Sequence, residues 1–358
     1  MTKRVTAGKH RAAGGRHERH RSKRLRTALI VSLVTLLGLG GAVGGYAWYL
    51  AAQFDNSLTK VEGVITETPR PVFESETLYQ PQNILLLGSD TRGKLGTDAN
   101  VTGKRSDVMM FIHISGDRKS VHIMSIPRDT WVDIPCFREG KINWATSYGG
   151  AACAVATVEG FLDTHIDHFA MIDFSGVKEL ADILGGVTVD NPRAFTSDTN
   201  DYERRHYRFD KGPITLEGAR ALAFVRERHA FSDGDISRGK NQQLFIKGVI
   251  SAITERGLFT NPAVMTELAT QVGKLLIVDP GLNTGWVAQT VLELSPFDPD
   301  SVVMFTMPVD KSAYIGNQYA ILPDEKALSL FTSNLGRDTL DLYTPPTGKK
   351  VDPGNQNG

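Results

Sequence analysis

The sequence predicts a three-layer α/β/α sandwich with a mixed central sheet, preceded by one N-terminal transmembrane helix. Short apolar segments rich in strand-forming residues alternate with segments of helical periodicity, and this order favours a sheet covered by helices on both faces. One apolar run near the N-terminus is longer than any of these segments. The 358 residues are 41% hydrophobic, enough for one large core or two small ones beside a membrane segment.

The transmembrane helix is predicted over residues 27–52. From Thr27 to Phe54 the only ionisable side chains are Tyr46 and Tyr49, and the run exceeds the ~20 residues that a spanning helix needs. Residues 1–26 carry ten Lys or Arg against one Glu, which leaves the other 332 residues net acidic by about nine. The charge asymmetry predicts a cytoplasmic tail and an extracytoplasmic remainder. A cleaved signal peptide is the alternative, but its apolar region is shorter, at ~7–15 residues.

The chain contains two cysteines, Cys136 and Cys153. In an extracytoplasmic domain two cysteines are more often bridged than free, so we expect a disulfide between them. It would close a loop of about 18 residues and contribute roughly 3 kcal/mol to stability. The alternative is two isolated buried thiols.

Two segments read as linkers. Residues 53–81 are polar and contain prolines, which is typical of a stalk that holds a domain away from the membrane. Residues 345–358 are mostly Pro, Gly, Asn and Lys without periodicity, so we expect disorder there. The folded domain is therefore predicted over residues 82–344.

Within that domain, strands and helices are expected in alternation. Three apolar segments suit buried strands, at residues 83–88, 107–115 and 120–127. Helical periodicity follows at residues 152–163 and 177–184, and Gly185 and Gly186 end the second helix. The later expected elements are a helix over 216–222, a short strand from Ala223 into Arg226, a long helix over 238–255, helices over 262–272 and 284–294, and a strand over 301–307.

The segment from Ala221 to Gln243 reads ALAFVRERHAFSDGDISRGKNQQ and concentrates arginines at hydrogen-bonding spacings. On an extended strand, the guanidinium groups of Arg226 and Arg228 leave the same face and can grip one dianion. The alternative is a set of solvated surface ion pairs, such as Arg226 with Asp233.

The helix after this pair adds a second set of polar groups. Arg238 and Gln242 are four residues apart and share one helix face, and Asp235 or Ser237 is a candidate cap. Guanidinium groups match phosphate oxygens bidentately. Arginines that converge from a strand and a helix start therefore indicate a phosphate or pyrophosphate site.

Charged residues also cluster where the first three predicted strands begin or end. They are Asp90, Arg105, Asp107, Arg128 and Asp129. Asp90 and Asp107 offer hard oxygen ligands of the kind that Mg²⁺ takes together with substrate phosphates. Asp90 and Asp129 also fit turns in which Asp bonds its own backbone. Asp107 heads an apolar strand, where a charge needs a partner or a metal.

Several blocks of sequence occur in one order between residues 82 and 335. They are NILLLGSDTR, RSDVMMFIHI, SIPRDTWVDIP, KINWATSYGG, IDHFAMIDFSGVKELADILGGVTVD, and GARALAFVRERH followed by DGDISRGKNQQ. Together these blocks resemble the LytR-CpsA-Psr family of Gram-positive cell-envelope enzymes. The resemblance implies a membrane-anchored, Mg²⁺-dependent phosphotransferase that moves a glycopolymer from a polyprenyl-pyrophosphate carrier to peptidoglycan, with pyrophosphate-lipid cleavage when no acceptor is present.

The resemblance also implies roles for individual residues. Asp90 and Asp107 would hold Mg²⁺ on the pyrophosphate. The residues implied to contact its oxygens are Arg105, Arg128, Arg226, Arg228, Arg238 and Gln242. Asp129 and Asp235 are candidates to accept the hydroxyl proton, although we expect Asp129 to orient Arg128 by a salt bridge. Asn241 departs from the family, where many members carry Arg, so the phosphate clamp is expected to be weaker or differently arranged.

Two other functions fit the same sequence. One is a hydrolase that cuts pyrophosphate lipids. The other is an envelope-linked transcriptional regulator whose basic tail touches DNA phosphates. Positive-inside topology explains that tail more simply, so we expect no nucleic-acid partner.

Overall fold

The computed structural model describes residues 44–46, 48–65, 77–89, 106–198, 206–255, 266–295 and 298–345. They belong to two units, residues 1–50 and 51–358. In the first unit, residues 44–46 and 48–50 are helical. Within this described part, no helix is long and apolar enough to cross a membrane. The predicted transmembrane span lies largely outside the described residues, as do the basic tail and nearly all of the C-terminal segment.

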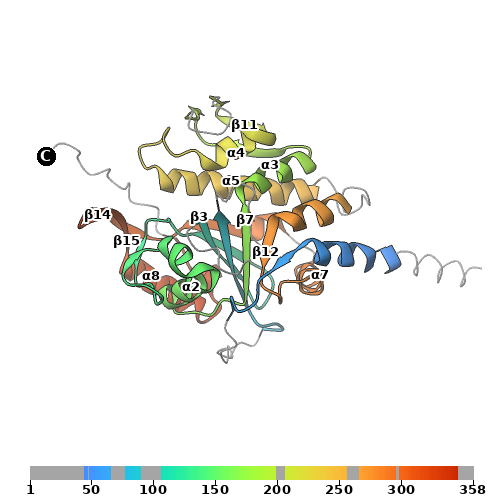
Figure 1. Ribbon diagram of the computed structural model, residues 1–358, viewed down its shortest axis with the longest axis horizontal. Coiled ribbons are helices and arrows are strands. Elements are labelled where there is room, and N and C mark those ends of the chain that lie inside the picture. Colours follow the sequence, from blue (N-terminus) through green and yellow to red (C-terminus); the bar gives the residue numbers. More distant parts are fainter. Residues whose placement is uncertain are drawn as a thin grey trace, which may run out of the picture. The chain divides into compact units, whose positions relative to one another are not determined.

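As the sequence predicts, the second unit is built on a mixed central sheet (Figure 1). This sheet has seven strands. In spatial order its strands are β1 (Thr59–Lys60), β12 (Leu276–Val278), β7 (His168–Asp173), β2 (Gln82–Ser89), β3 (Ser106–Ile114), β4 (Val121–Ser125) and β13 (Val302–Thr306). The β1–β12, β7–β2 and β4–β13 pairs are parallel, whereas β12–β7, β2–β3 and β3–β4 are antiparallel.

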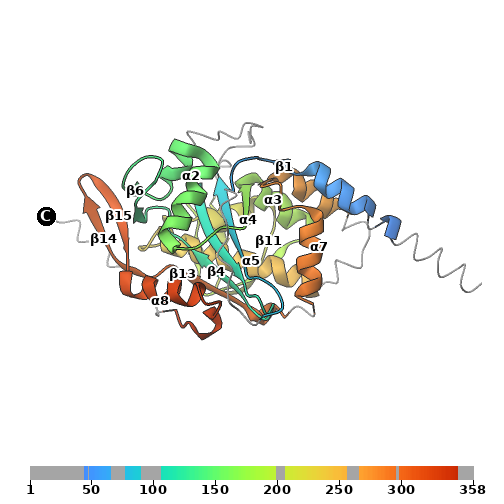
Figure 2. The same cartoon turned by 90° about the horizontal axis from the view of Figure 1, so that it is seen from below.

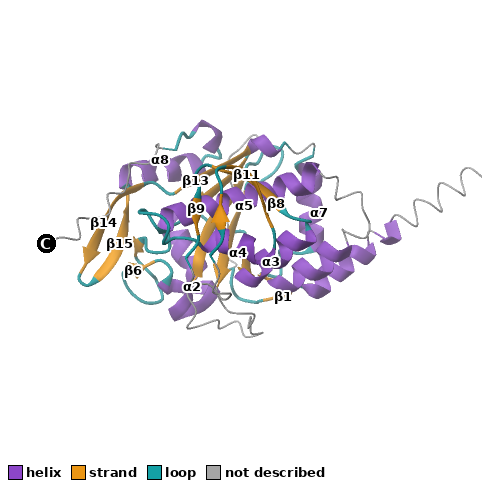
Figure 3. Cartoon of the chain, turned by 90° about the horizontal axis from the view of Figure 1, so that it is seen from above, coloured by secondary structure: helices purple, strands orange, loops and turns teal. Residues whose placement is uncertain are grey.

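Helices cover both faces of this sheet. Figures 1 and 2 show α2 (Trp144–Leu162) and α8 (Glu325–Leu335) on one side. The other side carries α5 (Asp235–Glu255) and α7 (Thr284–Glu293), with α3 (Phe174–Ile183) and α4 (Gly218–Arg226) outside α5 (Figure 3). Side chains alternate between the two faces of a strand. Leu85 and Leu87 accordingly pack against α2 and α8, and Ile84 packs with side chains of α5 and α7.

Four two-stranded sheets flank the main sheet. They are β5 (Trp131–Val132) with β6 (Gly140–Lys141), β8 (Val187–Asn191) with β11 (Gly212–Leu216), β9 (Phe195–Thr196) with β10 (Arg208–Phe209), and β14 (Val309–Ile315) with β15 (Gln318–Pro323). The α5 helix approaches β8 closely at Gly248, where a Cβ atom would lie 2.5 Å from the Thr188 carbonyl oxygen. Short helical turns occur at Leu268–Val272, Gly273–Leu275, Pro299–Ser301 and Leu340–Leu342.

The segment predicted to be a stalk is partly built into the fold. Residues 51–57 are helical, and the following strand β1 forms one edge of the main sheet through parallel pairing with β12. Val61 and Val64 are buried in the core on the α2 face. The prediction was wrong for these residues because local polarity dominates the segment, whereas a few spaced apolar side chains anchor it in the fold.

The strand predicted from Ala223 into Arg226 is instead the second half of helix α4. This predicted strand begins AFVR, and so short an apolar run does not distinguish a buried strand from a buried helix. Alanine, leucine and arginine all favour a helix, and the helix ends only at Glu227, whose backbone is extended. Arg226 and Arg228 therefore do not leave one face of a strand.

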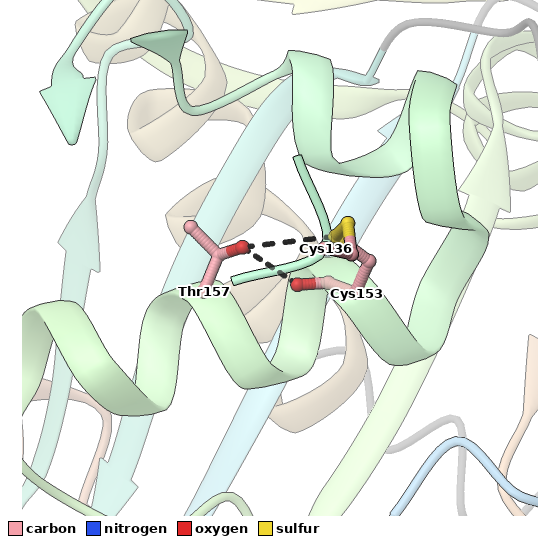
Figure 4. Close-up of a disulfide and its surroundings, with 3 residues drawn as sticks. All are labelled: Cys136, Cys153 and Thr157. Atoms are coloured by element: carbon pink, nitrogen blue, oxygen red, sulfur yellow. Dashed lines mark hydrogen bonds between the residues drawn. A yellow bond between two sulfur atoms is a disulfide. The ribbon is translucent and has the colours of Figure 1, made fainter. Parts of the chain in front are cut away.

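Cys136 and Cys153 are joined by the expected disulfide, with their Cα atoms 6.0 Å apart (Figure 4). The bridge ties the loop after β5 to helix α2, and Thr157 Oγ1 donates to the Cys153 carbonyl at 2.7 Å. A Cβ atom on Gly149 would lie 2.7 Å from Cys136 Sγ, so the bridge requires a glycine there.

Candidate functional site

The site forms at one end of the central strands of the sheet, where the end of one strand meets the start of the next. We call this end of the strands the edge that carries the site. Because β3 runs antiparallel to β2 and β4, the end of β2, the start of β3 and the end of β4 meet at this edge. Asp107 lies at the start of β3, and Arg128 follows the end of β4. The first turn of α5 carries Asp235 beside them. Strand ends of this kind are common ligand sites in α/β proteins.

Arg128 is the centre of a charged network. Its Nη1 donates to Asp107 Oδ1 at 2.6 Å, and its Nε donates to Asp235 Oδ2 at 3.0 Å. The second oxygen of Asp235 pairs with Arg238 Nη2 at 3.1 Å. Exposure falls from about a fifth for the side chains of Asp107 and Arg128 to 12% for Asp235 and 6% for Arg238. Pairs this dry are held in fixed geometry.

The network shifts the pKa values of its members. Burial by itself would raise the pKa of Asp235, but Arg238 and Arg128 together hold it below the ordinary value. Burial would lower the pKa of Arg128, and Asp235 and Asp107 more than offset it. The pKa of Arg238 is lowered by burial, against the opposing effect of Asp235. A buried cation of this kind gains from an added anion.

A narrow pocket with a cavity volume of about 20 Å³ lies against this network. Asp107, Arg128, Asp235, Arg238 and Gln242 all contribute to its wall. Arg238 Nε is buried and has no hydrogen-bond partner among the residues that the structure describes. Buried donors are normally satisfied, so an orphan donor beside a pocket indicates a ligand that brings an acceptor. The structure thus brings together five of the residues predicted from the sequence.

Arg226 and Arg228 flank the bend that follows α4. Arg226 is the last residue of the helix and is half-buried. Arg228 is also half-buried, and its charge acts on both Asp235 and Arg238. The buried Glu227 between them shapes the bend, because its carboxylate accepts from the Ala230 and Asp198 backbone amides at 2.9 and 2.7 Å. Arg228 therefore adds positive charge beside the pocket.

Asn241 and Gln242 fasten α4 to α5. Asn241 Nδ2 donates to the Phe224 carbonyl at 3.1 Å, and Gln242 Nε2 donates to the Val225 carbonyl at 3.2 Å. Both side chains are buried, and together they fix the end of α4 that carries Arg226. The amide at position 241 therefore has a structural use here.

Two expected local contacts differ in the structure. Asp129 was expected to orient Arg128, but it pairs with Lys141 at 3.2 Å, and Asp107 and Asp235 orient Arg128 instead. Asp235 was a candidate helix cap, yet both of its carboxylate oxygens bind arginine side chains. Longer-range pairing across the sheet edge outweighs these local options.

Part of the predicted metal and phosphate set lies outside the described residues, namely Asp90 and Arg105. Among the residues that are described, no group of three or more His, Cys, Asp or Glu side chains is arranged to hold a metal ion. Asp107 remains as one carboxylate at the pocket, and its Oδ1 accepts from Arg128 Nη1.

Residues 49–336 match the model of the LytR_cpsA_psr family. The chain belongs to this family. It is 32% identical over 285 residues to the polyisoprenyl-teichoic acid–peptidoglycan teichoic acid transferase TagU of Enterococcus faecalis, covering 77% of this chain and 89% of that protein. The TagU of Bacillus subtilis is 32% identical over 241 residues, which cover 66% of this chain and 72% of that protein. The crystal structure of B. subtilis TagV superposes with a TM-score of 0.61 at 27% identity, over 75% of this chain and 99% of that one.

The structure adds supporting residues to this LytR_cpsA_psr site that sequence reasoning missed. Gln243 Nε2 donates to Ser125 Oγ at 2.8 Å and to the Phe305 carbonyl at 2.9 Å, which binds α5 to β4 and β13. Arg193 donates to Ser237 beside the start of α5 and stacks 3.8 Å above the Phe231 ring. The only sequence signal for Gln243 was its place in the Gln-Gln pair, and Arg193 had none.

Proposed function

We propose that this chain is a membrane-anchored phosphotransferase that moves a glycopolymer from a polyprenyl-pyrophosphate carrier to peptidoglycan. Family membership and relatives named as teichoic acid transferases support the class of reaction. One observation carries the assignment to this site. Arg128 and Arg238 line a pocket in which a buried guanidinium N–H has no acceptor among the described residues, and Arg228 adds charge beside it.

The proposed step is an in-line displacement at phosphorus. A sugar hydroxyl of peptidoglycan forms a new P–O bond to the glycopolymer phosphate, and the bond to the bridging oxygen breaks. Polyprenyl phosphate leaves with that oxygen, and the proton of the attacking hydroxyl is taken up by this leaving phosphate. Such transfers need mainly positioning and charge neutralisation. Arg128, Arg228 and Arg238 supply three positive charges around two carboxylates, so the site is matched to an anionic group.

Asp235 serves in this proposal as a positioning residue. Both of its oxygens are bound by arginines, and its pKa lies below the ordinary value, which makes it a weak acceptor for the hydroxyl proton. Its effect on the reaction is then to hold Arg128 and Arg238 at fixed positions along the pocket. Fixed donors stabilise developing charge without reorganising during the step.

A magnesium ion fits the donors at this edge. Mg²⁺ is usually bound through one or two carboxylates together with substrate phosphates. Asp107 offers one such carboxylate at the pocket, and Asp90 is the second residue that we propose for the ion. When bound, the ion would neutralise charge on the pyrophosphate oxygens. Asp107 would at the same time keep Arg128 aligned through its other oxygen.

The anchor and the orientation of the chain are also part of the proposal. They rest on the apolar run over residues 27–52 and on the basic tail before it. The catalytic domain would then lie outside the membrane, where both peptidoglycan and the disulfide belong. A reporter fused after Ser57 tests this, because activity of a cytosol-only reporter at that position would contradict the orientation.

The reaction is tested with the full chain, a polyprenyl-pyrophosphate-linked glycopolymer and peptidoglycan oligomers. We expect a phosphodiester-linked polymer–peptidoglycan product, and pyrophosphate-lipid cleavage when the acceptor is left out. Arg228→Ala should remove both activities. Arg208→Ala, at an exposed arginine paired with Asp210, is the matched control and should retain both. Release of free glycopolymer phosphate alone, with acceptor present, would identify a hydrolase instead.

A further inference from the structure

Four aromatic side chains form a compact cluster around the N-terminal end of α2. The ring of Phe137 stacks on that of Tyr148, with centroids 3.8 Å apart and planes within 9°. Trp144 meets both rings edge-on, at 6.3 and 6.4 Å. Trp131 meets Trp144 edge-on at 6.2 Å. We call these four residues the aromatic platform.

The platform is held rigid by its surroundings. The disulfide of Cys136 fixes the neighbouring Phe137 to α2 (Figure 4). A Cβ atom on Gly140 would lie 2.4 Å from the Trp144 ring, so the β5–β6 hairpin packs directly on that indole. Rigid aromatic rings lose little conformational entropy when they bind a partner.

The platform is also open to solvent. Tyr148 is 54% exposed and Phe137 is 36% exposed, although one face of each ring is covered by the other. The exposed neighbours are charged, with Arg138 4.8 Å above the Phe137 ring and Glu139 beside it. Within the described chain, no large aliphatic side chain between residues 130 and 150 is exposed. Rings among charged groups suit a sugar, whose C–H face packs on a ring while its hydroxyls meet polar groups.

Short chain connections and backbone hydrogen bonds join the platform to Arg128 at the phosphate pocket. Trp131 is three residues from Arg128, which places their Cα atoms within about 11 Å. The Arg128 carbonyl accepts from the Asn143 amide at 3.2 Å, immediately before α2 begins at Trp144. Lys141, which pairs with Trp131 in the hairpin, also binds Asp129 at 3.2 Å. A peptidoglycan strand whose hydroxyl reaches Arg128 must also cover protein surface next to Arg128. The aromatic platform lies on such a neighbouring surface.

We propose that the aromatic platform is the docking surface for the glycan strand of the peptidoglycan acceptor. The proposal rests on the proposed transferase function, which requires that acceptor. Tyr148 presents the open ring on which a sugar stacks. The disulfide and Gly140 hold that ring in register with Arg128, so that a bound glycan delivers one hydroxyl to the phosphate pocket.

The test uses two probes, an oligomer of β-1,4-linked N-acetylglucosamine and lysozyme-solubilised peptidoglycan. Their binding to the full chain is measured by titration calorimetry and tryptophan fluorescence. Tyr148→Ala should weaken both affinities about tenfold. Tyr148→Phe keeps the ring and should stay within about twofold of wild type. Leu330→Ala, an exposed side chain on α8, is the control and should bind as wild type does.

The kinetic readout separates this proposal from the function on which it rests. Tyr148→Ala should raise the KM for the acceptor and leave pyrophosphate-lipid cleavage without acceptor unchanged. Wild-type affinity in Tyr148→Ala would overturn the platform, and so would binding of the platform to phospholipid vesicles in preference to glycan. If the wild-type chain binds glycan but forms no transfer product, the proposed transferase function is wrong. The platform would then still be a glycan-binding site.

Discussion

Two buried polar networks lie at opposite ends of the same three strands. At one end, Asp107 and Arg128 open onto a pocket. At the other end, His113 of β3 uses both ring nitrogens, to Asn83 Oδ1 at 2.7 Å and to Asp338 Oδ1 at 3.0 Å. Asp338 Oδ2 is also used, because the Gly116 amide donates to it at 2.9 Å.

The two networks differ in whether all of their hydrogen-bonding groups have protein partners. The His113 network closes on protein groups, whereas the Arg128 network leaves a buried arginine donor beside a pocket. A closed polar network stabilises one fold, and an open one is completed by a ligand. Changes at the first end should therefore alter activity, and changes at the second should alter stability.

The largest effect is expected from Arg128→Ala. It removes the donor that joins Asp107 to Asp235 and one charge from the pocket. We expect pyrophosphate-lipid cleavage to fall by about 100- to 1,000-fold, as for the loss of a transition-state donor. Single-turnover kinetics measure this, and Arg208→Ala serves again as the control. Equal activity in the two variants would mean that the open network is not the reaction site.

Removing the disulfide should affect stability and the platform together. We expect the Cys136→Ser, Cys153→Ser double variant to lose roughly 3 kcal/mol of unfolding free energy. Without the bridge, the loop that carries Phe137 is no longer tied to α2, so the variant should bind glycan more weakly. Lipid cleavage by the folded protein should persist. Urea unfolding and glycan titration on the same preparation check this. Loss of lipid cleavage at full folding would tie the bridge to the pocket.

A pH dependence of stability should originate at His122, which lies beside the His113 network but is not part of its closed set of hydrogen bonds. Burial and the neighbouring His113 lower the pKa of His122 to about 4, and its Nδ1 has no hydrogen-bond partner within the described structure. Asp341 and Asp338 oppose this shift only in part. His122 is then protonated below pH 6.5 in the unfolded state but only below about pH 4 in the folded state. Stability from this group is complete above 6.5 and is lost as the pH falls to about 4, by about 3 kcal/mol. Urea unfolding at a series of pH values should show this slope, and His122→Leu should flatten it.

The smallest effect is expected from Asp338→Asn. The amide cannot accept from both His113 and the Gly116 backbone as the carboxylate does, so we expect a loss of about 1–2 kcal/mol. Asp310→Asn, on the β14–β15 hairpin, is the control. Thermal unfolding gives the stability, and lipid cleavage per folded molecule should stay within about twofold of wild type. If Asp338→Asn lost lipid cleavage without losing stability, the two ends of the strands would not divide activity and stability between them.

The sequence predicted the parts of the site that local pattern determines. Asp107 and Arg128 stand at ends of apolar strands, and such strands and their ends are readable from hydrophobic runs. The spacing of Arg238 and Gln242 likewise placed both on α5. Family resemblance then supplied the reaction that we propose for these groups.

The rest depends on tertiary contacts. Helix α4 replaced a predicted strand because a short apolar run fits either state, and packing against α5 decided it through Asn241 and Gln242. Asp235 pairs with Arg238 at i,i+3 on α5, which the spacing does encode. The pairing of Asp235 with Arg128, and of Asp129 with Lys141, follows instead from which segments meet in the fold. No spacing along the chain encodes that information.

If the open network binds the pyrophosphate of the lipid carrier, losing one of its charged groups should reduce cleavage and leave folding intact. The most direct measurement compares wild type, Arg228→Ala and Asp107→Ala in magnesium buffer, by lipid cleavage and thermal unfolding of one preparation. We expect melting temperatures close to wild type in both variants, with cleavage reduced at least about 100-fold. Full turnover by both variants would contradict this expectation and leave the family resemblance as a statement about the fold.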